Sequence, residues 1–126
     1  MKKIIITDKA PAPIGPYNQA VLSGDTLYMS GQIALDPFTM ELVLDDIETE
    51  TQRVMENLKA VLEAAEMTFQ NVVKTTIFIT DMNNFGKINT VYGSCFNEKT
   101  APARETVQVS VLPKNVNVEI SMVAVK

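Results

Sequence analysis

Two amphipathic segments constrain the fold of this chain more than any other feature of its sequence. In each of them apolar residues recur at helical spacing and form one stripe, so each helix can bury only one side. Helices of this kind pack on one face of a β-sheet, which makes a two-layer α+β sandwich the expected fold class. The two stripes consist of Ile47, Val54, Leu58, Val61, Leu62 and Ala65, and of Phe85, Ile88, Tyr92, Cys95 and Phe96.

Alternating or β-branched runs predict strands around and between the two helices. Ser30-Gly31-Gln32 interrupts one of these runs, and a glycine inside a strand is typical of a bulge or a close backbone approach. Asp45 is the expected N-cap of the first helix, and residues 81–84 offer caps for the second. The predicted strands cover residues 4–7, 18–22, 27–33, 72–80, 107–111 and 116–121.

The last two predicted strands place an arginine and a carboxylate on polar faces. Arg104 is in phase with the polar residues that alternate with the valines of residues 107–111, and Glu119 lies between Val118 and Ile120. We therefore expect Arg104 and Glu119 to share the sheet face that points away from the helices. That face is mixed in character, which predicts a subunit interface. Its other expected members are Lys74, Thr76, Phe78, Thr106, Gln108, Asn117, Ser121, Val123 and Val125.

Length and composition indicate one globular domain, residues 1–126, with 46% hydrophobic and 21% charged residues. The net charge of −4 disfavours nucleic acid as a partner, because a nucleic-acid-binding surface is normally basic. The single cysteine, Cys95, cannot form an internal disulfide, which indicates a reducing compartment. Apolar runs are too short for a signal peptide or a transmembrane helix, so we expect a cytoplasmic protein without a leader or a membrane partner.

The residue inventory excludes several kinds of site. Histidine is absent, which excludes histidine base catalysis, a Ser-His-Asp triad and a histidine-ligated metal. The acidic residues between 41 and 50 lack the order of a calcium loop and indicate a charged first helical turn instead. Cys95 lies on an apolar stripe and is expected in the core. We predict neither a metal site nor a cofactor.

Arg104 and Glu119 leave two interpretations open. They could form an ion pair that joins subunits. Alternatively, the planar fork of Arg104 could bind a carboxylate beside backbone donors near Gly31, with Glu119 as a general base or a holder of water. Tyr17 ends a rigid proline-rich loop, which would fix its ring and hydroxyl at such a pocket or at an interface.

Six motifs follow one another in a characteristic order from about residue 4 to residue 125. They are IGPYNQA (residues 14–20), SGQIALDP (30–37), NLKAVLEAA (57–65), VVKTTIFITDMNNF (72–85), PARETVQV (102–109) and LPKNVNVEI (112–120). In this order they resemble the signatures of the reactive intermediate deaminase family of the RidA or YjgF type. Six ordered motifs are far more specific than any one of them.

The resemblance implies a chorismate-mutase-like fold, with a mixed six-stranded sheet and two helices on one face. It also implies a homotrimer with three clefts between neighbouring subunits. The implied reaction is hydrolysis of 2-imino acids or their enamine tautomers, such as 2-iminobutanoate and 2-iminopropanoate, to 2-keto acids and ammonia. No cofactor is implied, because a protonated imine is already electrophilic.

The same resemblance assigns roles to residues of this chain. Arg104 matches the arginine that grips the substrate carboxylate, and Glu119 matches the glutamate that positions the hydrolytic water. Asn89 matches a helix asparagine near the cleft. The remaining matches are Tyr17 as the loop tyrosine and Ser30 with Gly31 as the segment that supplies backbone contacts.

Three positions depart from the pattern of the family. Thr106 stands where many members carry a cysteine; we still expect it in the catalytic site, where its backbone carbonyl could hold water. Met40 replaces a common turn glycine, and Glu66 replaces a common glycine at the end of a helix. We expect both to be local variations of the backbone.

Two other functions stay open. The arginine pocket could bind a keto acid or an amino acid without turnover, and release of ammonia from a freshly generated imine would separate such a module from an enzyme. RNA cleavage with inhibition of translation has been attributed to relatives of the family. The acidic charge balance weighs against that activity.

Overall fold

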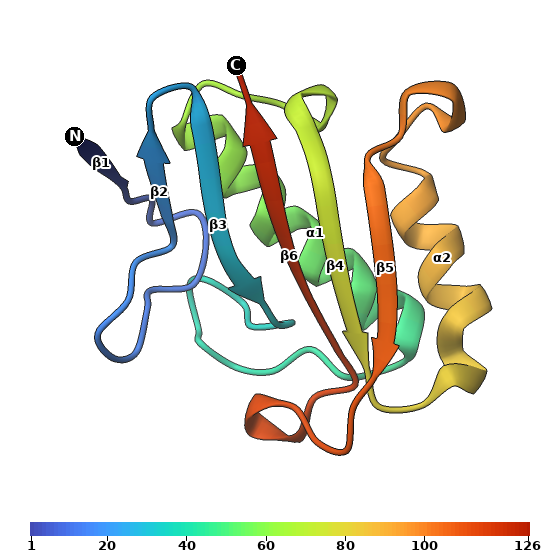
Figure 1. Cartoon of the computed structure of the whole chain (residues 1–126). Coiled ribbons are helices and arrows are strands. Elements are labelled where there is room, and N and C mark those ends of the chain that lie inside the picture. The colour runs from blue at the N-terminus through green and yellow to red at the C-terminus, as the bar shows by residue number, and fades with distance from the viewer.

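A six-stranded sheet with the strand order β1-β2-β3-β6-β4-β5 forms the body of the protein (Figure 1). The computed structural model describes residues 1–126. β4 and β5 run parallel and all other neighbouring strands run antiparallel, so the sheet is mixed as expected. The elements are β1 (Lys2–Ile5), β2 (Ala20–Ser23), β3 (Thr26–Gln32), α1 (Ile47–Ala64), β4 (Val72–Ile79), α2 (Phe85–Gly93), β5 (Ala103–Gln108) and β6 (Val118–Val125).

Both helices lie behind the sheet in Figure 1, with α1 across its centre and α2 beside β5. The other face of the sheet carries no helix. The apolar stripes of the helices pack on the inward side chains of β4 and β6 and form the core, as the sequence predicts. The fully buried members include Leu58, Leu62, Ile77, Ile79, Ile88 and Ile120.

Short polar contacts set where α1 and α2 begin. The N-cap of α1 is Asp46, whose carboxylate accepts a hydrogen bond from the Thr49 amide at 2.7 Å. The prediction of Asp45 is therefore wrong by one residue. Asp81 caps the short helical turn that leads into α2, because its carboxylate accepts from the Asn83 amide at 3.0 Å.

The phase of β5 contradicts the expectation for this strand. Arg104 lies opposite Thr75 of β4, and Thr106 lies opposite Ile77. Thr75 and Ile77 are buried under the helices, so Arg104 and Thr106 also point to the helical side. Gln108 follows the same phase, and its side chain accepts from the Met82 amide at 2.8 Å.

Val107, the one valine of β5, consequently occupies the face that lacks helices. Val107 lies opposite Phe78 and is 43% exposed. Tyr28 of β3 and Val125 of β6 are further exposed apolar side chains of this face. The mixed character of the face is thus confirmed, and β5 contributes both Val107 and Glu105, whose carboxylate accepts from Lys74 Nζ at 2.9 Å.

A bulge interrupts the pairing of β3 with β6. The register shifts between Met29 and Gln32, so Ser30 and Gly31 lack regular partners in β6. This confirms the interpretation of Ser30-Gly31-Gln32 as an interruption. The bulge lies at the end of β3 and leads into the loop before α1.

A single buried glutamine holds the proline-rich loop against the sheet. The Gln19 side-chain amide donates to the carbonyl oxygens of Thr7, Ala10 and Pro11 at 2.9–3.2 Å. Its carbonyl oxygen accepts from the Thr7 amide at 2.8 Å. Prolines cannot donate backbone hydrogen bonds, so Gln19 supplies the contacts that fix this loop.

Both predicted backbone variations adopt a left-handed conformation. Met40 has a φ of 59° and Glu66 a φ of 60°. At Glu66 this conformation ends α1 in a Schellman motif, in which the Met67 amide donates to Leu62 and the Glu66 amide donates to Glu63. Neither α1 nor α2 combines the length and the apolar character that a helix needs to cross a membrane.

Replacing Glu66 by Gly should stabilise the protein by roughly 0.5–1 kcal/mol. Glycine has no Cβ atom, so it adopts the left-handed conformation without the free-energy cost that glutamate has there. The matched control is Glu63→Gly, which places the same substitution inside α1 and should destabilise by roughly 0.5–1 kcal/mol. Urea denaturation at one fixed protein concentration measures both. Equal effects of the two substitutions would contradict the prediction.

Candidate functional site

Glu119 is a half-buried carboxylate on the sheet face that lacks helices. Its neighbours Val118 and Ile120 are fully buried under the helices, so the Glu119 side chain points to the opposite face. No side-chain hydrogen bond or ion pair joins its carboxylate to another residue of the chain. Burial raises the pKa of the Glu119 carboxyl above its usual range. Glu119 is therefore free to act on a ligand or a water molecule.

Gly31 provides the surface on which the Glu119 side chain lies. A Cβ atom at position 31 would come within 3.0 Å of Glu119 Cδ and 3.1 Å of Oε2. At these distances a side chain at position 31 would force the Glu119 side chain to shift. The bulge at Ser30 and Gly31 is thus the close backbone approach that the sequence suggested.

Ser30 uses its polar groups within the chain. Its hydroxyl donates to the Asn18 carbonyl oxygen at 2.6 Å, and its amide donates to the Gln19 carbonyl oxygen at 3.0 Å. These two bonds leave neither of these donors for a ligand. Among the predicted residues Ser30 therefore shapes the bulge, and Gly31 faces the site.

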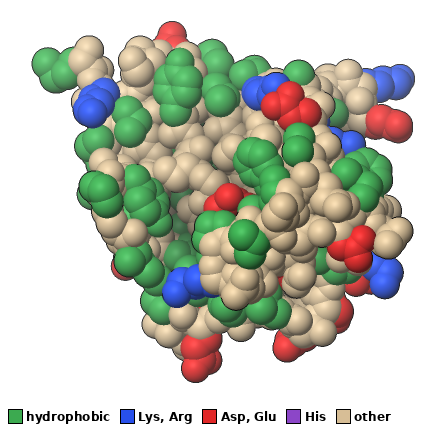
Figure 2. Space-filling model, turned by 60° about the horizontal axis from the view of Figure 1, so that its bottom comes forward, with side chains coloured by type: hydrophobic (Ala, Val, Ile, Leu, Met, Phe, Trp, Pro, Cys, Tyr) green, Lys and Arg blue, Asp and Glu red, His purple; other side chains and the backbone are tan.

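A cavity of about 300 Å³ adjoins Glu119 at the end of the sheet. Figure 2 shows this end of the molecule hollowed, with hydrophobic side chains gathered beside the hollow. Tyr17 lines the cavity, and its hydroxyl accepts a hydrogen bond from the Ile14 amide at 3.3 Å. The other lining residues are Pro11, Ala12, Ile14, Gln19, Gly31, Gln32, Ile33, Leu35, Pro113, Lys114 and Glu119. We call Tyr17, Gly31 and Glu119 the Glu119 cluster.

Lys114 brings a positive charge to the wall of this cavity, which the sequence analysis did not identify. It forms no ion pair within the chain. Lys114 and Asn115 both have a φ of 56°, a left-handed conformation that costs a residue with a side chain roughly 1–2 kcal/mol. The only signal in the sequence is the Pro-Lys-Asn turn between the last two strands.

Arg104 belongs to a second cluster, on the helical side of the sheet edge. Its Nη1 donates to Asn89 Oδ1 of α2 at 2.6 Å. The guanidinium carbon lies 5.6 Å from the centroid of the Phe85 ring and 5.2 Å from that of Tyr92. These cation–π contacts and the bond to Asn89 hold the guanidinium in one place. We call Asn89, Tyr92 and Arg104 the Arg104 cluster.

A wider cavity of about 570 Å³ opens beside the Arg104 cluster. Phe96 and Glu98 are among its lining residues, together with Asn89, Tyr92 and Arg104. Thr106 lies two residues further along β5, and its buried hydroxyl has no hydrogen-bond partner in the chain. The apolar stripe of the second predicted helix already contained Phe85 and Tyr92, but it gave no sign that they contact an arginine.

The two clusters lie on opposite faces of one sheet. Arg104 is in phase with Thr75, whereas Glu119 lies opposite Phe78 on the other face. The expectation that Arg104 and Glu119 share a face is therefore wrong. The reason is that Val107 of β5 does not face the core, so the residues that alternate with it do not face away from the core. One chain cannot form a pocket from both residues.

No group of three or more His, Cys, Asp or Glu side chains lies close enough together to hold a metal ion. The charged groups that are available to a ligand are the Glu119 carboxylate, the Lys114 ammonium and the Arg104 guanidinium. Together they could bind a small anion, position water and accept a proton. These capacities fit an acid–base reaction on a small carboxylate.

Comparison with known proteins identifies the relatives of this chain. The family model described as Endoribonuclease L-PSP matches residues 7–126. The 2-iminobutanoate/2-iminopropanoate deaminase of Mus musculus is 45% identical over 126 residues, which cover 100% of this chain and 93% of the relative. Several other relatives, with 45–52% identity, are named only as RutC family proteins.

Two solved structures support the same relationship. The crystal structure of RidA from an Antarctic Psychrobacter species has a TM-score of 0.94 at 43% identity and covers 98% of this chain and 99% of its own. The structure of E. coli TdcF with bound serine has a TM-score of 0.92 at 44% identity, with 98% of each chain covered. Its sequence motifs, its fold and these relatives show that the chain belongs to the RidA/YjgF family.

Proposed function

We propose that this protein hydrolyses 2-imino acids, such as 2-iminobutanoate and 2-iminopropanoate, to 2-keto acids and ammonia without a cofactor. The named activity of the mouse and rat relatives supports this assignment. The observation that carries it is the Glu119 carboxylate, which is half-buried, unpartnered and adjacent to a cavity of about 300 Å³. The cytoplasm is the proposed compartment, because the single thiol would stay reduced there.

Arg104 binds the substrate carboxylate in this proposal. The guanidinium is already oriented by Asn89 and by two aromatic rings, so little conformational freedom is lost when a carboxylate binds. Its remaining N–H groups can contact both oxygens of the carboxylate. The serine in the E. coli TdcF structure is an amino acid with a carboxylate, which supports a ligand of this class.

Assembly of the chain into a homotrimer supplies the missing half of each site. Because the two clusters lie on opposite faces, the Arg104 cluster of one chain meets the Glu119 cluster of the next. A contact between two different surfaces closes into a ring when the rotation is suitable, and a rotation of one third of a turn gives three clefts. The exposed apolar side chains of the sheet face, including Tyr28 and Val107, favour burial in such an assembly.

The chemistry then needs one water molecule. Glu119 accepts a proton from the water as its oxygen bonds to the imine carbon, which gives a tetrahedral carbinolamine. Glu119 gives this proton to the amine nitrogen. The carbon–nitrogen bond then breaks as the carbinolamine hydroxyl transfers its proton to the Glu119 carboxylate and forms the carbonyl, which releases ammonia and the 2-keto acid. The raised pKa of Glu119 favours the first step, because it makes the carboxylate a stronger base towards water. Thr106 contributes a backbone carbonyl that can hold the water.

A binding module and a ribonuclease are the alternatives to test. A module would bind 2-keto acids but release no ammonia from imines generated by a pyridoxal-phosphate enzyme. The family description Endoribonuclease L-PSP raises the second possibility for this chain. Its net charge of −4 disfavours contact with RNA phosphates, so we expect no salt-sensitive retention on RNA.

Arg104→Lys should lower kcat/KM for imine hydrolysis about ten- to over a hundredfold, equivalent to roughly 1.5–3 kcal/mol. Lysine keeps the charge but lacks the planar fork that contacts two carboxylate oxygens. Lys99→Ala is the control. It removes an exposed cation that is close in sequence to residues of this cavity, but Lys99 itself does not line the cavity. Full activity in Arg104→Lys would mean that the carboxylate binds elsewhere.

Glu119→Gln and Arg104→Ala chains should each be inactive as pure trimers, because each lacks one half of every site. Mixed and reassembled in equal amounts, they should regain about a quarter of the normal activity, since random association pairs an intact Arg104 with an intact Glu119 at about one interface in four. Light scattering should return the mass of a trimer for every sample. A stable monomer, or no recovery in mixed trimers, would refute the shared cleft.

Gly31→Ala should reduce turnover while the fold and assembly persist. The added Cβ would push the Glu119 carboxylate away from its position, because only 3.0–3.1 Å is available. Gly86→Ala is the matched control, since a Cβ there meets nothing within 4 Å and lies in α2. Ammonia release and a crystal structure of each variant measure the effect. An unmoved Glu119 with unchanged activity would contradict the prediction.

A further inference from the structure

α1 buries three polar side chains within its apolar stripe, and the hydroxyl of one of them, Thr51, donates within the helix to the Ile47 carbonyl oxygen. The other two, Glu50 and Asn57, are fully buried, and Glu50 is the only buried charged residue of the chain. They lie two helical turns apart, which corresponds to about 10 Å along the axis, and on the same side of the helix. Neither residue belongs to the site described above, yet each forms several hydrogen bonds to another segment.

Glu50 binds the chain just before Glu119. Its Oε2 accepts from the backbone amides of Asn117 and Val118 at 2.8 and 3.2 Å, and its Oε1 accepts from Asn117 Nδ2 at 2.7 Å. Val118 is the first residue of β6, and Glu119 follows it directly. The position of the Glu119 backbone is thus tied to α1 through one carboxylate.

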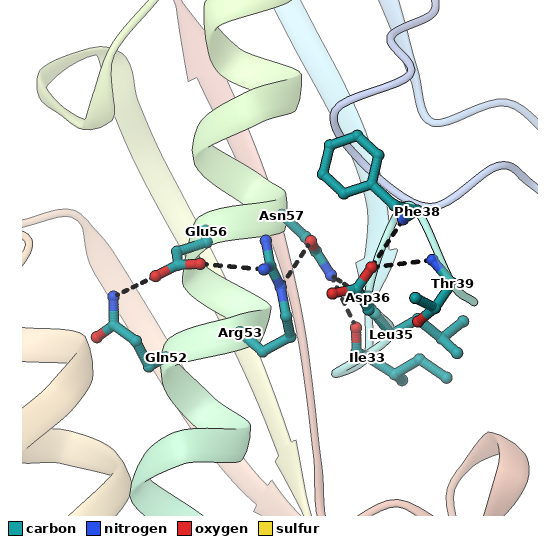
Figure 3. A network of polar contacts seen from close by, with 9 residues as sticks. All are labelled: Ile33, Leu35, Asp36, Phe38, Thr39, Gln52, Arg53, Glu56 and Asn57. Carbon is teal, nitrogen blue, oxygen red and sulfur yellow. Dashed lines mark hydrogen bonds and ion pairs between the residues drawn. The ribbon is translucent and has the colours of Figure 1, made fainter. Parts of the chain in front are cut away.

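Asn57 binds the segment that follows Gly31. Its side-chain amide donates to the carbonyl oxygens of Ile33 and Leu35 at 3.2 and 3.0 Å. Its Oδ1 accepts from Arg53 Nε at 3.2 Å, and Arg53 also pairs with Glu56 at 3.1 Å (Figure 3). The bond from Arg53 orients the amide so that its NH2 group faces the two carbonyls.

The two anchored segments are the ones that bring Glu119 and Gly31 together. Ile33 and Leu35 follow Gly31 closely and line the Glu119 cavity with it. Asn117 and Val118 precede Glu119, which lies on Gly31. A helix is stiff, so two anchors on one side of α1 hold the two segments at a constant separation.

We propose that Glu50 and Asn57 are positioning residues, which use α1 as a rigid spacer to hold Glu119 against Gly31 in the geometry needed for turnover. Neither residue touches the substrate. This inference rests on the proposed hydrolysis of imines, so its test includes a measurement that does not depend on turnover. A displacement of about 1 Å at a reacting group can cost up to about a hundredfold in rate, which makes such anchoring effective.

Two conservative substitutions at position 50 distinguish the effect of side-chain length from the effect of charge. Gln keeps the length of Glu, so one oxygen can still accept from both backbone amides, and the Asn117 amide can rotate to accept from the new NH2 group. Asp keeps the charge but is one methylene shorter and cannot reach all three donors. If Glu50 acts by position, Gln preserves function and Asp does not. If it acts by its charge, the order is reversed.

The experiment measures kcat and KM for imine hydrolysis in trimeric Glu50→Gln and Glu50→Asp. We expect Glu50→Asp to lower kcat about 10- to 100-fold with KM changed by less than about twofold, and Glu50→Gln to stay within about twofold of the parent. Glu48→Gln is the matched control, because it alters an exposed carboxylate in the same helical turn and should change neither constant. Should Glu50→Asp fail to assemble, Asn117→Ala removes one of the three contacts and should lower kcat in the same way.

Carbon-13 NMR of the Glu119 carboxyl supplies the measurement that needs no substrate. Tyr17 and Lys114 are the other ionisable side chains that line this cavity in one chain, and Arg104 of the neighbouring chain faces it in the proposed trimer. The substitutions alter none of the three. The pKa of Glu119 should stay raised in Glu50→Gln and fall towards its ordinary value in Glu50→Asp, as the carboxylate moves off Gly31. An inactive parent protein would refute the proposed hydrolysis and leave this titration to decide the positioning role. Unchanged kcat and Glu119 pKa in both variants, or loss in Glu50→Gln alone, would overturn the inference.

Discussion

The register of β6 is the constraint on which the rest of this structure depends. β6 pairs with both β3 and β4, and its alternate residues from Val118 to Ala124 are buried beneath the helices. A slip by one residue would place the Glu119 carboxylate in the apolar core and the core residues on the open face. Burial of these apolar residues of β6 therefore also fixes the direction of the Glu119 side chain, without a separate interaction to orient it. The bulge in β3 then allows the Glu119 side chain to lie across Gly31.

Much of this arrangement could be predicted because it depends on local patterns. The helical stripes and the alternating runs each report which side of an element is apolar, and two single-sided helices allow few architectures. The interruption at Ser30-Gly31-Gln32 was equally local, and the structure confirms a bulge there. Left-handed backbone at Met40 and Glu66 agrees with the expectation of a local backbone variation at each position. Contacts between segments that are far apart in the sequence produce no such local pattern.

The errors have a common physical cause, which is that a pattern does not say what covers a face. The valines of residues 107–111 indicate an apolar face, but the same alternation results whether helices of the same chain or a neighbouring chain cover it. Core burial was assumed, and this reversed the direction of Arg104. Glu50 and Asn57 were overlooked because the stripe of α1 was defined by its apolar members alone. A polar residue in phase with such a stripe was the signal that could have found them.

The contact between Glu119 and Gly31 also restricts how relatives of this protein can diverge. A larger residue at position 31 is compatible with the same backbone only if the side chain at position 119 becomes shorter or turns away. A replacement of Gly31 is therefore restricted as long as Glu119 is present, whereas a shorter side chain at position 119 would remove the restriction. The two positions are far apart in the sequence, yet the effect of a mutation at one depends on the residue at the other, which is epistasis between them.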